Sequence, residues 1–387
     1  MLKVNYTLLI ALTLACGAAV SNAAGSEANG TVAPIIGVLA QEIYEDSLIA
    51  RHFNSTSYIA ASYVKFVEGA GGRVVPIWIG QERSYYENLL RQINGVLLPG
   101  GGTWFNNSKG YGEAGEHIIH IAKEINTNAS YFPVWGTCLG MELLVLVMNN
   151  NVETRFDCKS QGQTIPLDFK PTYNESRMFA GASAELITLM SKQNVTYNYH
   201  RNCYTQQSFE NSSWRIMSIN NDLQGVEFVS TIEHLQYPFY GVQFHPEKNL
   251  YEFVSKLIPH TAGAVHSAQY FADFFISEAR RNKHTFDNAA EQSAAMIYNY
   301  KPEYTAKIGS GYIQQYLFDT DSEEEVEETP EEPEPVEPEP DPDNDHPYPN
   351  YPYYMHHGDY AAATQPLLTC ILMSLAFVVC AGRFVNN

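Results

Sequence analysis

Short apolar runs alternate with helical patterns along the first part of the chain. The runs have the length of strands and lie at Ile35–Leu39, Val74–Ile77, Val96–Leu98 and Val134–Gly136. Between them, apolar residues recur at helical spacing at Ile59, Tyr63, Phe66 and Val67, and Glu116–Ile125 has a second helical pattern. Strands that alternate with helices pair in parallel, with helices on both faces of the sheet. We therefore expect a three-layer α/β fold with a mostly parallel sheet, whereas the segments after Asn149 give no clear order of elements.

Residues 132–143 join an apolar strand to an apolar helix through a turn that presents Cys138. The helix, Leu139–Met148, is apolar nearly all round, which predicts a central buried position. Gly136 and Gly140 flank the turn and allow the backbone to bend sharply. Helical N–H groups near the sulfur favour the thiolate, which is the nucleophilic form. The segment therefore predicts a nucleophile, and the alternative is a buried structural cysteine.

A second candidate segment, Phe239–Asn249, contains His245 and Glu247. We interpret it as a strand that ends in these two residues, because side chains two apart in an extended backbone point to the same side. Pro246 also favours extended geometry at His245. Glu247 would then hold one imidazole nitrogen while the other faces a thiol, as in Cys–His–acid catalysis. Alone, such a histidine is more often an ordinary polar residue.

A third segment, Ile93–Gly102, is an apolar run that ends in Pro-Gly-Gly-Gly. Consecutive glycines bring backbone N–H groups close to a ligand, as an oxyanion hole requires. Alone, a glycine run is only a turn signal, but the ends of parallel strands are where such sheets build their sites. We therefore expect Gly101, Gly102 and the N–H of Leu139 to bind the oxyanion and the substrate.

Together, the motifs Gly-Thr-Cys-Leu-Gly, Pro-Gly-Gly-Gly and Gly-Val-Gln-Phe-His-Pro-Glu resemble the class I glutamine amidotransferase superfamily. This resemblance implies a flavodoxin-like fold. Glu142 stands where glutaminase domains usually carry glutamine, and the sequence around Cys138 and His245 is similar to one branch, the γ-glutamyl hydrolases. The likeness covers roughly residues 33–315. It also implies that His200 lies near the substrate, although an ordinary exposed histidine is the alternative.

The resemblance implies a cysteine hydrolase of the γ-glutamyl bonds in folylpoly-γ-glutamates and antifolate polyglutamates. It would act through a γ-glutamyl thioester and release glutamate or poly-γ-glutamate. Two other functions are open at this point. A glutaminase that feeds ammonia to a synthetase is disfavoured by Glu142 and by the lack of a second catalytic domain in the sequence. A catalytically silent cell-surface protein is disfavoured because Cys138, His245 and Glu247 are all present.

The two ends of the chain differ from its body. Residues 1–24 combine Lys3, an apolar run and small residues, which predicts a signal peptide cleaved near Ala23 or Ala24, with a membrane anchor as the alternative. Residues 25–318 form the expected catalytic domain. Residues 319–365 form an acidic, proline-rich linker, which composition predicts to be disordered. Residues 366–387 form a hydrophobic tail that fits either a transmembrane helix or a GPI signal.

Most of the net charge of −20 comes from this linker, since residues 319–345 hold fifteen Asp or Glu. The body has 27 acidic and 21 basic residues, and no basic patch supports nucleic-acid binding. If Cys138 stays reduced, Cys158 and Cys203 are the pair left for a disulfide, because the other three cysteines lie in the terminal segments. No cluster has metal-ligand spacing, so we expect neither a metal nor another cofactor.

Seven Asn-X-Ser/Thr sequons in the expected mature domain predict glycosylation on loops or exposed faces. They begin at Asn29, Asn54, Asn106, Asn128, Asn174, Asn194 and Asn211. With the signal peptide, they predict entry into the secretory pathway, with the lysosome, the vacuole or the extracellular space as destination. The expected partners are a small-molecule folylpoly-γ-glutamate and, through the tail, a membrane; a homodimer is left open.

Overall fold

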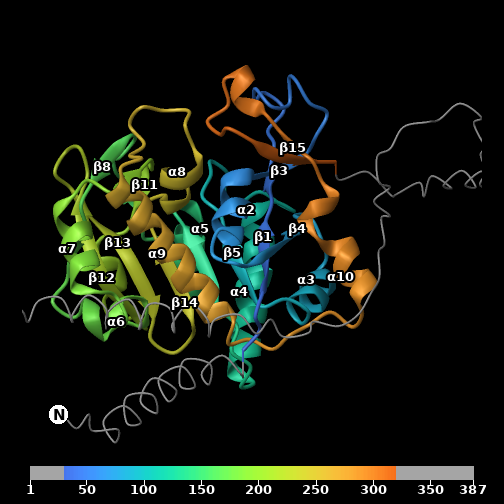
Figure 1. Ribbon diagram of the computed structural model, residues 1–387, viewed down its shortest axis with the longest axis horizontal. Coiled ribbons are helices and arrows are strands. Elements are labelled where there is room, and N and C mark those ends of the chain that lie inside the picture. Colours follow the sequence, from blue (N-terminus) through green and yellow to red (C-terminus); the bar gives the residue numbers. More distant parts are fainter. Residues whose placement is uncertain (1–29, 320–387) are drawn as a thin grey trace, which may run out of the picture. The chain divides into compact units, whose positions relative to one another are not determined.

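The computed structural model describes residues 30–319, which are built around an eight-stranded sheet (Figure 1). The strand order is β4-β1-β5-β6-β14-β13-β12-β9. The first five strands run parallel: β4 (Arg73–Ile77), β1 (Ile35–Leu39), β5 (Gly95–Leu98), β6 (Val134–Thr137) and β14 (Phe239–Val242). The last three are antiparallel: β13 (Glu227–His234), β12 (Trp214–Asn221) and β9 (Asp168–Phe169). The prediction of a mostly parallel α/β sheet is confirmed.

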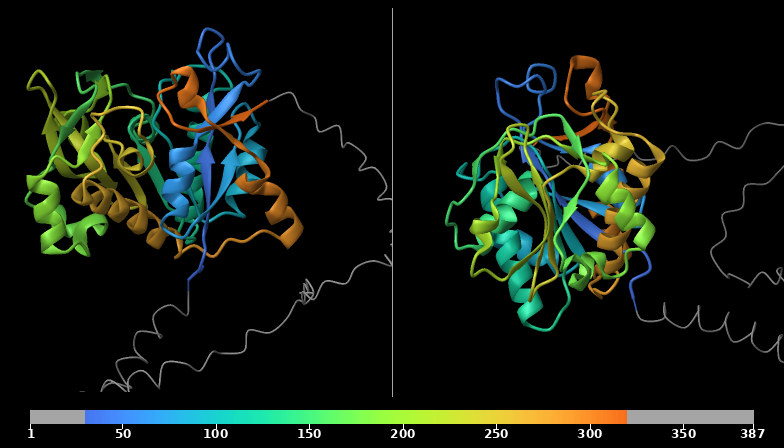
Figure 2. Two further views of the ribbon diagram at one scale, coloured as in Figure 1. Left: turned by 45° about the horizontal axis from the view of Figure 1, so that its top comes forward. Right: turned by 90° about the vertical axis from the view of Figure 1, so that its left-hand side faces the viewer.

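Helices cover both faces of this sheet, as the two views of Figure 2 show. Consecutive residues of β1 pack into opposite cores: Ile35 and Leu39 join one cluster, and Ile36 and Val38 the other. The first core includes α3 (Arg83–Leu90), α4 (Tyr111–Thr127) and α5 (Leu139–Met148). The second includes α2 (Ala61–Glu68), α7 (Ala184–Lys192) and α9 (Ala262–Ala279). A strand buried on both faces explains why these runs are continuously apolar.

Some predicted boundaries change. Ile59, which we assigned to a helix face, lies in β3 (Ser57–Ala60), and the helix begins only at Ala61. The backbone of Ile59 is paired with β16 (Gln315–Phe318), so sheet pairing outweighs the helical spacing at this position. β3 also pairs with β2 (Gln41–Glu42), and β16 with β15 (Pro302–Glu303). The helix predicted at Glu116–Ile125 extends over all of α4.

The region after Asn149 builds the antiparallel half of the sheet and two small ribbons. β7 (Phe156–Asp157) pairs with β11 (Asn202–Cys203), and β8 (Gln163–Ile165) pairs with β10 (Thr196–Asn198). The predicted disulfide Cys158–Cys203 is present beside the first ribbon, with the two Cα atoms 6.0 Å apart. The remaining helices are α6 (Arg177–Ala180), α8 (Pro246–Tyr251), α10 (Ala289–Ala295) and the 3₁₀ turns at Tyr173–Glu175, Gln206–Phe209, Ile297–Asn299 and Thr305–Ile308.

The predicted signal peptide, most of the acidic linker and the hydrophobic tail lie outside the described residues, as does the sequon at Asn29. Within residues 30–319, no helix has the length and apolar character needed to span a bilayer. The other six sequon asparagines are all exposed, as expected for sites on loops and outer faces.

Candidate active site

Cys138 occupies a sharp turn between β6 and α5. Its φ of 51° is in the left-handed region that residues with a side chain rarely adopt, and its N–H donates to the Val242 carbonyl at 2.7 Å. The turn depends on glycine: a Cβ on Gly140 would lie 1.9 Å from the Leu98 carbonyl oxygen, and one on Gly136 would lie 2.6 Å from the Gly140 backbone. A strained residue on a strand-to-helix elbow is typical of a nucleophile.

His245 and Glu247 form the predicted pair, but not in the predicted way. β14 ends at Val242, and His245 is the cap residue before α8, so Glu247 lies in the first turn of a helix rather than in a strand. Pro246 causes this difference, because its fixed φ suits the first helical position. His245 Nδ1 still lies 2.8 Å from Glu247 Oε1, and both residues are buried. With Nδ1–H bound to the carboxylate, Nε2 is the nitrogen left for a thiol.

Three neighbouring strands bring these residues together. β5, β6 and β14 are adjacent in the sheet, so the loops at their carboxyl ends lie side by side. A Cβ on Gly100 would lie 2.7 Å from His245 Cε1 and 3.1 Å from Cys138 Cβ. These two atoms can therefore be no farther apart than the sum of those distances. The cysteine and the imidazole converge on the glycine loop, as the sequence predicts.

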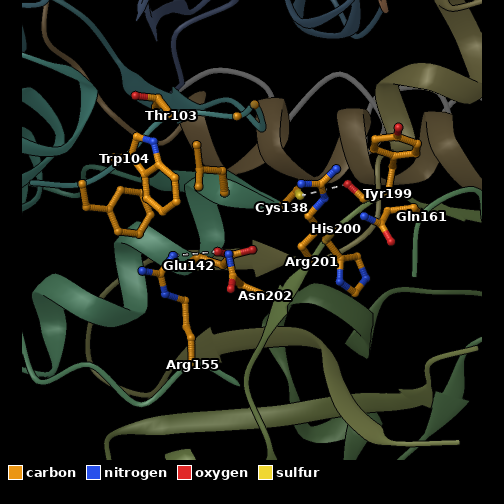
Figure 3. A pocket seen from close by; sticks show the side chains of 14 residues that line it. Thr103, Trp104, Cys138, Glu142, Arg155, Gln161, Tyr199, His200, Arg201 and Asn202 are labelled. Atoms are coloured by element: carbon orange, nitrogen blue, oxygen red, sulfur yellow. Dashed lines mark hydrogen bonds and ion pairs between the residues drawn. The ribbon is translucent and has the colours of Figure 1, made fainter. Parts of the chain in front are cut away.

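The same loop lines a cavity of about 430 Å³ in front of Cys138 (Figure 3). Gly101, Gly102 and Leu139 all line it, as the prediction of an oxyanion site requires. Gly100 is different, because its N–H donates to the Tyr63 hydroxyl at 2.8 Å and is not free for a substrate oxygen. That hydroxyl also lies 3.4 Å from His245 Nδ1, so Tyr63 joins the glycine loop to the histidine.

The pKa of the Cys138 thiol is higher than the position at a helix N-terminus alone would suggest. Burial raises its pKa well above the ordinary value, and the negative charge of Glu142 raises it further, whereas the Leu139 N–H lowers it. The expected helix effect on the thiolate is therefore present but outweighed by desolvation. Gln243 lies between the two groups, with Nε2 3.0 Å from Glu142 Oε1 and 3.8 Å from the sulfur.

Glu142 is a buried carboxylate at the back of the cavity. Its Oε2 accepts a hydrogen bond from Arg155 Nη1 at 2.9 Å, and Arg155 also binds Glu153 at 2.6 Å. Burial nevertheless raises the pKa of Glu142 to about 7. The Arg155 guanidinium further lies over the Phe105 ring at 4.5 Å, so its donors and its face are occupied by the protein itself.

His200 lines the cavity beside the disulfide. Its Nδ1 lies 3.4 Å from the Cys158 sulfur and 3.2 Å from the Cys203 sulfur, and its Nε2 lies 3.2 Å from Asn198 Oδ1. Burial lowers the pKa of His200 to about 3, so the ring is neutral. In the described part of the chain, Cys158, His200 and Cys203 are the one set of side chains close enough together to bind a metal ion. The two sulfurs are, however, bonded to each other in the disulfide.

Four residues of the site were not among those predicted from the sequence. Tyr63 was used above only as a position of a helical pattern and Gln243 only as part of a motif, and nothing in either local pattern points to their partners in the site. Arg155 and Arg201, which also line the cavity, fall in the region whose elements could not be ordered. Arg201 is exposed and directed into the cavity in Figure 3.

Comparison with known proteins gives consistent matches over this region. A family model described as peptidase C26 matches residues 34–247, which include Cys138, His245 and Glu247. "Gamma-glutamyl hydrolase" of Rattus norvegicus is 42% identical over 314 residues, which cover 79% of this chain and 96% of that protein. The Homo sapiens protein of the same name is 36% identical, with 79% and 96% covered. A solved glutamine amido transferase from Methylobacillus flagellatus is 10% identical, with 67% and 100% covered and a TM-score of 0.38.

Proposed function

The chain belongs to the γ-glutamyl hydrolases, within the peptidase C26 family, and we propose that Cys138 is the nucleophile with which it hydrolyses γ-glutamyl bonds. The observation that carries this proposal is the convergence of the Cys138 and His245 side chains on Gly100, with Glu247 behind the imidazole. A nucleophile, a base and a group that orients the base are the parts required for acyl transfer.

In the first step, His245 Nε2 takes the thiol proton as the sulfur attacks the γ-carbonyl carbon. Because burial keeps the thiol protonated, the proton leaves during the attack rather than before it. The N–H groups of Leu139 and Gly101 stabilise the oxyanion, and each such donor contributes about 3 kcal/mol in the transition state. His245 then protonates the departing nitrogen, and a γ-glutamyl thioester on Cys138 remains.

In the second step, His245 removes a proton from water, which attacks the thioester carbonyl. The C–S bond breaks, the γ-carboxylate product leaves, and the sulfur regains its proton from His245. Glu247 holds the imidazole with Nδ1–H toward the carboxylate throughout both steps. Glu247 acts through His245, so it is a positioning residue.

We propose folylpoly-γ-glutamates and their antifolate counterparts as the substrates. Two exposed aromatic side chains support this choice, because Trp104 and Tyr199 line the cavity with 69% and 56% of their surface accessible. Exposed rings at a cavity mouth are suited to stacking on a planar group such as a pteridine.

The test is incubation of the protein with a defined folate pentaglutamate, followed by mass spectrometry of the products. We expect shortened γ-glutamyl chains from the wild type and none from Cys138→Ala. An otherwise identical substrate with α-linked glutamates is the control and should remain intact. Unchanged cleavage by Cys138→Ala would contradict the assignment of the nucleophile.

We propose that the enzyme works in the secretory pathway or outside the cell, held at a membrane by its C-terminal segment. The disulfide and six exposed sequons support this location. Truncation before Pro366 should release active enzyme into the medium, and treatment with an N-glycosidase should reduce its mass. Light scattering on the released protein would show whether it forms the homodimer. Retention on membranes after truncation would contradict the proposed anchor.

A further inference from the structure

Arg201 is an unpaired cation in the catalytic cavity. It is exposed and lines the same space as Cys138, and within residues 30–319 its guanidinium has neither an ion-pair nor a hydrogen-bond partner. The other arginine of the cavity, Arg155, is bound by Glu142 and Glu153. Among the residues that line this cavity, Arg201 is thus the cation left to bind an anionic ligand. The catalytic body as a whole has more acidic than basic residues.

The backbone that carries Arg201 is rigidly held. Its carbonyl accepts the Cys158 N–H at 2.8 Å, and Cys203, two residues later, is bonded to Cys158. Two residues earlier, the Tyr199 carbonyl lies 4.0 Å from the Cys138 sulfur. The loop is therefore fixed against the nucleophile on one side and against the disulfide on the other. In Figure 3 the Arg201 side chain extends from this loop into the cavity that Cys138 also lines.

A γ-glutamyl residue carries a carboxylate four carbon–carbon bonds from its scissile carbonyl. When that carbonyl meets the sulfur, the α-carboxylate must lie in the cavity within a short distance of it. The two candidates besides Arg201 are unsuited to bind it, because His200 is neutral and Arg155 already holds two carboxylates. A guanidinium binds a carboxylate with two parallel hydrogen bonds, so it reads shape as well as charge.

We propose that Arg201 binds the α-carboxylate of the glutamate whose γ-carbonyl is attacked by Cys138. This inference rests on the proposed γ-glutamyl hydrolysis and assigns its substrate specificity to one side chain. Arg201 would distinguish a γ-linked glutamate from γ-linked residues that lack the charge, such as an isoglutamine. It would do so without taking part in bond making or breaking.

The test compares two substrates on three proteins. The substrates are a pteroyl-γ-glutamyl-glutamate with a free α-carboxylate at the cleaved residue, and the same compound with that group as a carboxamide. The proteins are the wild type, Arg201→Ala, and Arg91→Ala as a control, because Arg91 is an exposed arginine at the end of α3 that does not line the cavity. The readout is kcat/KM for each pair.

We expect the wild type and Arg91→Ala to prefer the carboxylate by about tenfold, the lower end for a charge-assisted hydrogen bond at a partly exposed site. Arg201→Ala should lose this preference, mainly through a higher KM for the carboxylate substrate, and should lose much less activity on the carboxamide. Arg201→Lys should keep part of the preference, because it keeps the charge but not the paired donors.

Two results would overturn the inference: an Arg201→Ala protein that keeps the full preference, or one that loses equal activity on both substrates. The second result would indicate a structural role for the side chain. If the wild type cleaved neither compound, the proposed function itself would fail and this inference with it. Turnover by the wild type separates that outcome from the other two.

Discussion

The substitution Glu142→Gln makes the sharpest quantitative test of the site's electrostatics. Glu142 is buried at the start of α5, with Arg155 on one carboxylate oxygen and Gln243 on the other. A glutamine has nearly the shape of the protonated acid, so the substitution fixes the neutral form.

Burial raises the pKa of Glu142 from 4.5 to about 7 in the folded protein. Between these two values the folded state holds a proton that the unfolded state has lost. The free energy of unfolding must therefore fall as pH rises through this window, by 1.36 kcal/mol for each unit of pKa difference. In total, the free energy of unfolding falls by about 3 kcal/mol. The loss is complete above the pKa of Glu142 in the folded state and absent below its pKa in the unfolded state.

The assay is urea unfolding of wild type and Glu142→Gln at intervals from pH 4 to pH 8.5. We expect the difference between the two unfolding free energies to move by about 3 kcal/mol in favour of the variant across this range. Glu45→Gln, which removes an exposed carboxylate, is the control for a simple change in net charge. A constant difference between wild type and Glu142→Gln at all pH values would refute the reasoning.

Other substitutions test the remaining parts of the site. Cys138→Ala should abolish γ-glutamyl hydrolysis with little change in the urea midpoint, and His245→Asn should reduce turnover nearly as far; a mild loss would indicate another base. Loss of the Cys158–Cys203 bridge, which closes a separation of 45 residues, should lower the free energy of unfolding by about 4 kcal/mol, and unaltered stability would contradict that cost. Gly140→Ala should prevent correct folding, because the new Cβ would strike the Leu98 carbonyl; a normal circular dichroism melt would count against the tight elbow.

The parallel half of the fold follows directly from the sequence. The boundaries of β1 and α5 agree with the prediction, because both are largely apolar runs, with Pro34 just before β1 and Asn149 just after α5. The structure brings Cys138 and His245 together for a related reason: each follows a strand of one parallel sheet, whose carboxyl ends meet at one edge. Local sequence patterns are therefore sufficient to predict site residues that follow strands whose carboxyl ends lie side by side in the sheet.

The other features depend on contacts between distant segments. Tyr63 binds Gly100, 37 positions away, and Arg155 binds a carboxylate 13 positions earlier, and neither contact has a local signature. The high thiol pKa likewise comes from burial by the whole fold rather than from the turn. For Glu247 the predicted contact is present but the predicted element is wrong. We predicted a strand where Pro246 begins a helix, and Glu247 contacts His245 from the first turn of that helix.

In the proposed mechanism, Cys138 carries the γ-glutamyl group between the two steps. Rapid acid quench of the enzyme with excess folate pentaglutamate, followed by peptide mass spectrometry, tests it directly. We predict a hydroxylamine-labile γ-glutamyl mass increase on the peptide that contains Cys138. Product release during the quench series with no adduct on that peptide, or with the adduct on another residue, would contradict this mechanism.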